Sequence, residues 1–315
     1  MSRPLLWIDT DTGVDDAIAL LVGVQLDDVE VVGVSSVCGN VKESLTFENA
    51  RNVLSLAGRE DIPVYPGAEA PMCIPLETAE YVHGENGLGG ASIPSSNAVR
   101  ETIPAWDAIY TAAKAHPGEL ELVLIGPETN AALALTKYPD LKHLLKRILI
   151  MGGAIIGGNS SASAEFNIYV DPHAAEVVFR SGVPVVMCGL DVTMQAWLDE
   201  DDFRKIEQLH SPAAQLILDS TKTARELYKQ RVGDYYVVHD LCPILYAVKP
   251  ELFRHETAGV YVETRGSITR GHTVSDLYTD KDFEDRHVEV VLDVDRDRFV
   301  QIILEALASY EESEN

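Results

Sequence analysis

Short apolar segments alternate with longer segments of helical periodicity through the first 190 residues, and this alternation constrains the fold more than any other feature. The apolar segments are compact, as expected for strands covered on both faces. The predicted strands occupy residues 5–9, 29–37, 62–65, 121–125, 148–151 and 183–188. The predicted helices occupy residues 15–25, 45–57, 105–115, 129–138 and 172–180. This order predicts an α/β fold with a doubly wound, mostly parallel sheet and helices on both faces.

Beyond residue 190 the pattern becomes mainly helical, over residues 199–209, 212–230 and 240–248. Strand-like alternation returns at residues 259–263 and 287–293, and a last helix follows. The sequence contains no Pro/Ser-rich linker, low-complexity segment or repeat that marks a domain boundary. We therefore expect a single domain over residues 1–315, with a helical insert in its C-terminal third.

The charge balance excludes some classes of partner. The 315 residues include 50 acidic and 25 basic side chains, a formal net charge of −25 at pH 7. Nucleic acids and anionic membranes attract positively charged proteins, so neither is an expected partner. The four cysteines lie far apart, which indicates neither a zinc site nor a disulfide framework. Since no apolar run approaches the roughly 18 residues of a membrane helix, we expect a cytoplasmic protein.

Four carboxylates crowd into eight residues directly after the first predicted strand: Asp9, Asp11, Asp15 and Asp16. Ligands of open α/β sheets bind at the carboxyl ends of the strands. Like charges at such a place raise one another's pKa unless a cation lies among them. Oxygen ligands without clustered Cys or His indicate a hard ion, with Ca²⁺ favoured over Mg²⁺. The alternative is an acidic helix N-terminus, in which Asp15 and Asp16 interact only with the helix dipole.

Two known motifs compete for this segment. An EF-hand loop starting at Asp9 is excluded, because Val14 occupies the position of the turn glycine and Leu20 that of the bidentate glutamate. The Asp9-Thr-Asp-Thr string also matches the start of haloacid-dehalogenase-type phosphohydrolases. Those enzymes need a later acidic pair, for which Asp201 and Asp202 are candidates, although no apolar strand precedes them.

A third motif extends over far more of the chain. Asp9, Asp11, Gly13, Asp15, Asp16 and Ala17 match the pattern DxDxGxDDA, and further stretches follow in order: Cys38-Gly-Asn, His83-Gly-Glu-Asn-Gly-Leu, Gly126-Pro-Glu-Thr-Asn, Met151-Gly-Gly, Ala164-Glu-Phe-Asn-Ile, Asp171-Pro and His239-Asp. Together they resemble the inosine-uridine preferring nucleoside hydrolase family. Two positions depart from the family pattern: Glu128 stands where an apolar residue is commoner, and Leu241 where proline is frequent.

The resemblance implies a calcium site and a hydrolytic reaction. In the family pattern Asp11, Asp16, the backbone carbonyl of Thr129 and Asp240 hold Ca²⁺. A cation makes a bound water more acidic. Asp11 would then take the proton of this water, which attacks the anomeric carbon of the ribose. Surrounding oxygens stabilise the oxocarbenium character that develops on the sugar.

The resemblance also implies a ribose pocket. Asn40, Glu165 and Asn167 have amide and carboxylate groups that can bind a diol, and Asp15 joins them. For Asn40 and Asn167, ordinary loop or cap chemistry is an equal alternative. Met151 follows an apolar strand and is more often a core residue; only the family pattern places it beside the ribose.

Departure of the base calls for a group that can protonate it or stabilise its anion, and histidine suits this role near neutral pH. His239 is the leading candidate because it precedes the metal ligand Asp240, and His83 in a Gly-rich loop is the second. The resemblance implies a different base pocket for purine-specific family members, in which tryptophans lie around the base. Since none of the three tryptophans stands at these positions, a pyrimidine-preferring or broad inosine/uridine specificity is expected. Residues 220–231, with Tyr228, Gln230 and Arg231, are expected to complete the base pocket.

The sequence therefore predicts a nucleoside N-ribohydrolase that releases free base and ribose from a small-molecule nucleoside. Two alternatives remain open: a Mg²⁺-dependent phosphohydrolase with Asp9 as nucleophile, and a non-catalytic ribose- or calcium-binding protein. By analogy with the family, we expect a homodimer or homotetramer. The sequence does not identify the preferred base.

Overall fold

The computed structural model describes residues 3–231, 233–277 and 287–312. Its main-sheet strands are β1 (Leu5–Thr10), β2 (Glu30–Ser36), β3 (Val64–Tyr65), β4 (Leu120–Leu124), β5 (Leu145–Met151), β6 (Val185–Cys188), β9 (Phe253–Val262), β10 (Thr273–Asp276) and β11 (His287–Val294). Its longer helices are α1 (Val14–Gly23), α2 (Glu43–Leu56), α4 (Ala105–Ala115), α5 (Thr129–Lys137), α7 (Pro172–Phe179), α9 (Glu200–Glu207), α10 (Pro212–Arg231), α11 (Leu241–Val248) and α12 (Arg296–Glu312).

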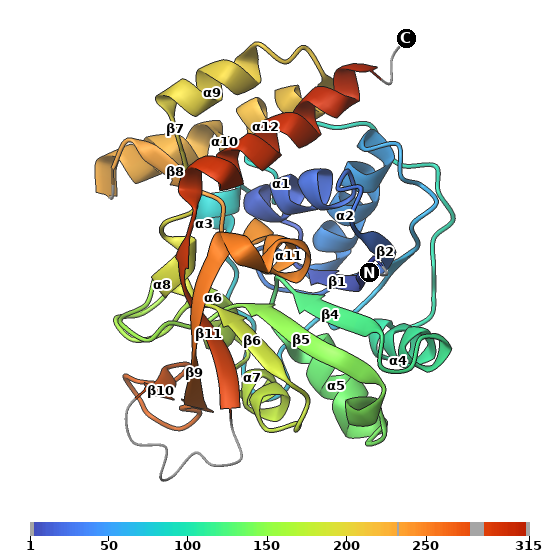
Figure 1. The fold of residues 1–315 in the computed structure, drawn as a ribbon, viewed down its shortest axis with the longest axis vertical. Helices are drawn as coiled ribbons and strands as arrows, with labels where there is room; N and C mark the ends of the chain where they lie inside the picture. Colours follow the sequence, from blue (N-terminus) through green and yellow to red (C-terminus); the bar gives the residue numbers. More distant parts are fainter. Residues whose placement is uncertain (1–2, 232, 278–286, 313–315) are drawn as a thin grey trace.

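The nine strands of the main sheet follow the order β10-β9-β11-β6-β5-β4-β1-β2-β3. The pairs from β3 to β11 are parallel, whereas β9 and β10 add an antiparallel edge. Helices cover both faces of the sheet (Figure 1). The predicted doubly wound, mostly parallel α/β fold is confirmed.

Each face of the sheet has its own apolar core. Helix α1 packs with α2, α10, α11 and α12 on one face, while α4, α5 and α7 pack together on the other. Strand β1 contributes to both cores, because Leu6 and Ile8 belong to the first and Trp7 to the second. Alternation of buried side chains along one strand is the geometry that a doubly covered sheet requires.

The strand order reverses direction at the β1–β4 pair, and this reversal locates the ligand crevice. The chain proceeds from β1 outward to β2 and β3, then returns to β4 on the other side of β1 and continues to β5 and β6. Open α/β sheets bind ligands outside the carboxyl ends of the strands at such a point. The acidic segment after β1 and the loop between β4 and α5 lie there.

The C-terminal third holds the predicted helical insert as α9, α10 and α11. Several short elements along the described chain were not predicted from the sequence patterns. These are β10, the short helices α3 (Glu80–His83), α6 (Phe166–Val170) and α8 (Leu190–Thr193), and a separate two-stranded sheet of β7 (Trp197–Asp199) and β8 (Tyr235–Val237). Two 3₁₀ turns, Leu141–His143 and Pro250–Leu252, complete the described elements. Strand β9 begins at Phe253, earlier than the predicted residue 259.

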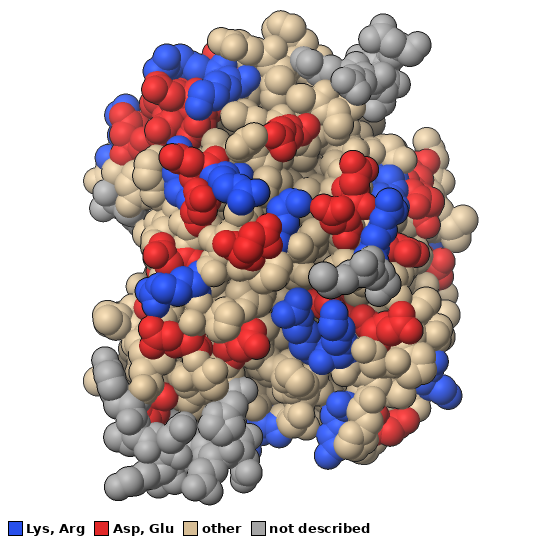
Figure 2. Space-filling view, viewed as in Figure 1, with Lys and Arg blue, Asp and Glu red and all other residues tan. Residues whose placement is uncertain are grey.

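The surface carries mixed charge despite the acidic excess. Several basic side chains lie in ion pairs, including Arg59 with Asp61 and Lys137 with Asp107. On the face shown in Figure 2, Lys and Arg lie beside Asp and Glu. Within the described ranges, no helix combines the length and the apolar content needed to cross a membrane.

Candidate active site

A cavity of about 580 Å³ opens at the carboxyl ends of the central strands. Most of the predicted site residues line it: Asp11, Asp15, Asn40, His83, Met151, Glu165, Asn167, His239 and Asp240. They come from segments at or beyond the ends of different strands, so the fold brings together segments far apart in the sequence. The other two predicted residues, Asp16 and Thr129, are buried and are not part of the cavity lining.

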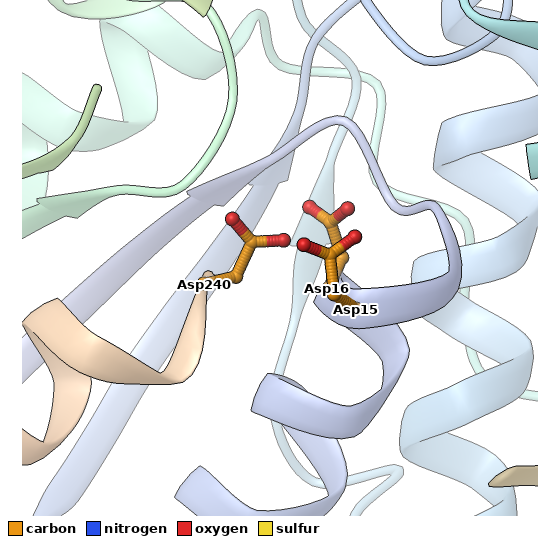
Figure 3. A group of neighbouring side chains, drawn as sticks. All are labelled: Asp15, Asp16 and Asp240. Carbon is orange, nitrogen blue, oxygen red and sulfur yellow. The ribbon is translucent and has the colours of Figure 1, made fainter. Parts of the chain in front are cut away.

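Three carboxylates form a compact group at one end of this cavity. Asp15 and Asp16 lie in the first turn of α1, and Asp240 is the N-cap residue of α11. One oxygen from each lies within 4.8 Å of the others, and Figure 3 shows the three carboxylates facing one another. Asp11, a metal ligand in the family pattern, is not a member of this compact group, whereas Asp15, which that pattern assigns to the ribose, is.

Hydrogen bonds fix the carboxylates of Asp11, in the loop between β1 and α1, and of Asp16, in the first turn of α1. Asp16 accepts from the Thr10 hydroxyl at 2.5 Å, from the Gly13 amide at 2.8 Å and from the Asn40 side chain at 3.0 Å. Asp11 accepts from the Asn40 amide at 2.7 Å. The Cβ of any other residue at Gly39 would overlap the Asp11 carboxylate. The Cys38-Gly-Asn stretch therefore holds both Asp11 and Asp16.

Burial raises the pKa of every carboxyl in this group. The pKa of Asp15 is raised to about 7, first by burial and then by the charge of Asp16. The pKa values of Asp11 and Asp240 lie well above the ordinary range, also mainly because of burial and then because of neighbouring aspartates. Burial also raises the pKa of Asp16, although the hydrogen bonds from Thr10 and Gly13 lower it in part. The fold thus crowds carboxyl groups into a poorly solvated place that disfavours their charged forms.

These residues fit a divalent cation. Buried carboxylates that repel one another are stabilised by a positive ion placed among them. The donor atoms are all oxygens, the ligands that hard ions such as Ca²⁺ and Mg²⁺ prefer. Thr129 is the first residue of α5, and its hydroxyl donates a hydrogen bond to Asp171 at 2.8 Å. The atom of Thr129 that was predicted as a metal ligand is its backbone carbonyl oxygen.

The two predicted histidines line the same cavity. The Nδ1 atom of His83 accepts a hydrogen bond from the Val14 amide at 3.1 Å. The ring of His239 lies between two hydroxyls, with Nδ1 2.8 Å from Thr193 Oγ1 and Nε2 3.4 Å from Tyr228 Oη. Burial lowers the pKa of both imidazoles to about 4, and for His83 the nearby His239 adds to the effect. Both rings are therefore neutral at pH 7.

Three polar side chains of the cavity wall already have protein partners. The Asn167 side-chain amide donates to the Met151 carbonyl at 3.0 Å, and Glu165 accepts from the Asn167 and Gly153 amides at 2.9 and 3.0 Å. Glu165 also caps α6. Burial raises the pKa of Glu165 to about 7, against these backbone donors. Asn40 donates to Asp16 in the same way. Cap and loop chemistry is thus present, and it orients these side chains in the wall.

Residues 220–231, which were expected to complete the base pocket, contribute only in part to the cavity wall. Tyr228 and Leu227 of α10 line the cavity, whereas Gln230 is exposed on the surface. The Arg231 side chain lies outside the described residues. Sequence reasoning missed other lining residues: Tyr81, Asn159, Asp191, Met194 and Tyr236. Tyr236 stands in a three-residue strand and Met194 directly after a four-residue helix, elements too short for hydrophobic periodicity to reveal.

The structure does not support the phosphohydrolase alternative. Asp9 is fully buried, accepts from Ser35 and Asn130, and is not part of the cavity wall. The acidic pair Asp201 and Asp202 lies in the first turn of α9, where Asp202 forms ion pairs with Lys205 and Arg296. These contacts explain the charge of that segment as helix capping and ion pairing.

Comparison with known proteins gives a consistent result. Residues 6–301 match the family model for inosine-uridine preferring nucleoside hydrolases. The chain belongs to this family. It is 38% identical to the pyrimidine-specific ribonucleoside hydrolase RihA of Citrobacter koseri, across 98% of this chain and 99% of that protein.

Solved structures of nucleoside hydrolases have the same fold. A plant nucleoside hydrolase, PpNRh1, superposes with a TM-score of 0.92 at 30% identity, covering 98% of this chain and 99% of its own. A purine-preferring ribonucleoside hydrolase from Gardnerella vaginalis has the same TM-score at 32% identity, with the same coverage. The predicted family and the predicted enzyme class, a nucleoside hydrolase, are confirmed. The comparisons give no support to a phosphohydrolase or to a non-catalytic binding protein.

Glu128 is one of the two positions at which the sequence departs from the family pattern. The side chain is fully buried, and neither carboxyl oxygen has a hydrogen-bond partner among the described residues. Burial raises its pKa well above the ordinary range, and the charges of Glu165 and Asp171 raise it further. When folding raises the pKa of a carboxyl, the group is more easily protonated in the folded state than in the unfolded state. The protein therefore becomes less stable as the pH rises from the pKa of the unfolded state through that of the folded state.

Glu128→Leu is therefore expected to stabilise the protein, by about 1–3 kcal/mol at pH 8 and by less at pH 5. Urea unfolding at both pH values, in the presence of a chelator, measures the difference. Glu121→Leu is the matched control, because Glu121 is equally buried but pairs with Lys146 and Arg147, and its loss should destabilise. A Glu128→Leu protein less stable than the parent at pH 8 would contradict the assignment.

Proposed function

We propose that this chain hydrolyses the N-glycosidic bond of ribonucleosides with a preference for pyrimidine bases, releasing free base and ribose. One observation carries the proposal. A single cavity has the compact group of three buried carboxylates at one end, and its wall contains two neutral imidazoles, His83 and His239. The carboxylates suit the electron-poor sugar of the transition state, and the imidazoles suit the departing base.

We propose Ca²⁺ as the cofactor, with Asp11, Asp16, the Thr129 carbonyl and Asp240 as its ligands. The compact group of Asp15, Asp16 and Asp240 supports two of these ligands and brings Asp15 close to the same ion. A bound Ca²⁺ would make a water more acidic and would attract the ribose hydroxyls. Mg²⁺ is the alternative, but a site with many carboxylates and carbonyls suits the larger ion better.

Asp11 is proposed as the general base. It lies in the cavity wall with a raised pKa, and the Asn40 amide fixes one of its oxygens. Its carboxylate takes the proton of the attacking water, whose oxygen forms the new bond to the anomeric carbon. The bond between that carbon and the base nitrogen breaks with its electron pair leaving on the base.

Asp15, Asn40, Met151, Glu165 and Asn167 are proposed to bind the ribose. Asn40 and Asn167 both donate through their side-chain NH₂ groups to protein oxygens. No residue of the described ranges donates to either Oδ1 atom, so each can accept a hydrogen bond from a sugar hydroxyl. The Met151 sulfur lies 3.5 Å from the Asn167 amide and packs beside these groups.

His239 is proposed to stabilise the departing base, with His83 beside it. Because both pKa values are lowered to about 4, neutral imidazole N–H groups would donate hydrogen bonds to the negative charge that develops on the base. Tyr228 contacts His239 and completes this end of the cavity. Groups of this kind contribute about 10²–10⁴-fold to a rate.

Two observations favour a pyrimidine base. RihA of Citrobacter koseri and RihA of Shewanella woodyi, 37% identical to this chain, are both described as pyrimidine-specific. Among the cavity-lining residues that the structure describes there is no tryptophan to enclose a purine. Trp7 stacks on Tyr65 and Trp197 lies near Tyr235, both away from the cavity wall.

We also propose a single domain over residues 1–315, a cytoplasmic location and a homodimer or homotetramer. The single domain is supported by the main sheet, which takes β1 from the start of the described chain and β11 from near its end. The location and the assembly rest on the composition and on the family analogy. Light scattering of the purified protein after size exclusion tests the assembly.

The function is tested by incubating the purified protein with uridine, cytidine, inosine and adenosine and assaying reducing sugar. We expect activity on uridine and cytidine to exceed that on the purine nucleosides, and a chelator to abolish it. Added Ca²⁺ should restore activity. Absence of ribose release from all four nucleosides, with Ca²⁺ present, would refute the proposal. Release of phosphate from nucleotides under the same conditions would instead support the phosphohydrolase alternative.

A further inference from the structure

Thr193 is a fully buried hydroxyl that the family motifs do not include. It is the last residue of the short helix α8, which follows β6 in the chain. Among the described residues its hydroxyl has one hydrogen-bond partner, Nδ1 of His239, at 2.8 Å. The backbone holds the two residues in place, because the Ala196 amide donates to the Thr193 carbonyl at 2.9 Å and the Val238 amide donates to the Ala196 carbonyl at 2.8 Å.

The direction of this hydrogen bond follows from the burial of Thr193. A hydroxyl has one proton to donate and two lone pairs to accept with. A buried donor without an acceptor costs about 1–3 kcal/mol. If His239 carried its proton on Nδ1, the Thr193 proton would have no acceptor within the part of the chain that the structure describes. Thr193 therefore donates to Nδ1, and the proton of the neutral imidazole sits on Nε2.

We propose that Thr193 is a positioning residue that holds His239 as the Nε2–H tautomer, ready to donate to the departing base. The inference rests on the proposed function, because it assigns His239 the role described there. His83 shows the same arrangement, since its Nδ1 accepts from the Val14 amide and its proton must also be on Nε2. Both imidazoles bind a protein group through Nδ1, which leaves Nε2 as the protonated nitrogen.

Tyr228 is consistent with this tautomer. Its hydroxyl lies 3.4 Å from Nε2 of His239 and can accept from Nε2–H while the cavity holds no base. When a nucleoside binds, an acceptor atom of the base can replace the Tyr228 oxygen without any rotation of the ring. A histidine with the other tautomer would present a lone pair to the base, and lone pairs repel the negative charge that develops there.

The test compares Thr193→Val, which keeps the shape and removes the hydroxyl, with Thr193→Ser, which keeps the hydroxyl. We expect Thr193→Val to lower kcat for uridine on the order of 10²-fold, because the ring remains but its tautomer is no longer fixed. The KM should change little. Thr193→Ser should retain kcat within about 3-fold. On nitrophenyl riboside, whose leaving group needs little assistance, Thr193→Val should lose less than about 3-fold.

Three results would overturn the inference: a Thr193→Val enzyme as active on uridine as the parent, equal losses in Thr193→Val and Thr193→Ser, or equal losses on uridine and nitrophenyl riboside. Nitrogen NMR of the imidazoles gives a readout without substrate. His239, assigned by its absence in His239→Gln, should show an unprotonated Nδ1 in the parent, and a protonated Nδ1 would refute the inference. A parent inactive on every nucleoside would refute the proposed function, while the NMR result would still decide the tautomer.

Discussion

Asp11→Ala lowers kcat for uridine by about 10³-fold and weakens Ca²⁺ binding at the same time: this is the result expected if one carboxylate serves both as general base and as ligand. Removal of a general base costs about 10²–10⁴-fold. The carboxylate is buried in the cavity wall, and Asn40 donates to one of its oxygens. Calorimetric titration with Ca²⁺ and steady-state kinetics with uridine measure the two effects separately.

Two variants make this experiment specific. Asp27→Ala removes an exposed carboxylate in the turn after α1 and should leave both quantities unchanged. Asp15→Ala removes a member of the compact carboxylate group and distinguishes the two possible ligand sets. If Asp15→Ala weakens Ca²⁺ binding more than Asp11→Ala does, the ion lies among Asp15, Asp16 and Asp240. Full activity in Asp11→Ala would show that another group takes the proton.

His239→Ala is expected to lower kcat for uridine by about 10²–10³-fold, because the departing base loses its hydrogen-bond donor. The same change should lower kcat for nitrophenyl riboside by less than about 10-fold, since nitrophenolate leaves without such assistance. Parallel measurement of both substrates gives the ratio that reports on the leaving group.

The control for this variant is His143→Ala, which removes an exposed histidine outside the cavity. It should retain the parental rates on both substrates. If His239→Ala loses the same factor on uridine and on nitrophenyl riboside, His239 acts on the sugar or on the fold, and its proposed role is wrong. A loss restricted to His83→Ala would assign the leaving-group role to that residue instead.

The parallel part of the fold could be predicted because its elements are long enough to show a period. Strands β1, β4 and β5 are compact apolar runs, and α4 and α5 end close to the predicted residues. The strands β7 and β8 have three residues each, which is too short for alternation to be visible. β10 contains Thr273, Ser275 and Asp276, so its sequence has little of the apolar content by which strands were predicted.

The site was predictable where a motif carried the chemistry. Asp11, Asn40 and Asp240 meet at the cavity as expected, although they come from three distant segments. The membership of Asp15 in the compact carboxylate group was not predicted, because its place in the first turn of α1 only becomes informative once Asp240 lies beside it. The sequence did not indicate a role for Thr193. Its proposed role depends on a hydrogen bond to His239, which lies 46 positions later in the chain.

The compact carboxylate group joins the start of the chain to a residue near its last quarter. Asp15 and Asp16 leave the ribosome early, whereas Asp240 follows only after β1 to β8 have been synthesised. A truncated polypeptide that stops before this residue lacks one member of the trio, and under the proposed mechanism it would be inactive. If the trio holds the proposed cation, this site would form only after the chain as far as Asp240 has been synthesised.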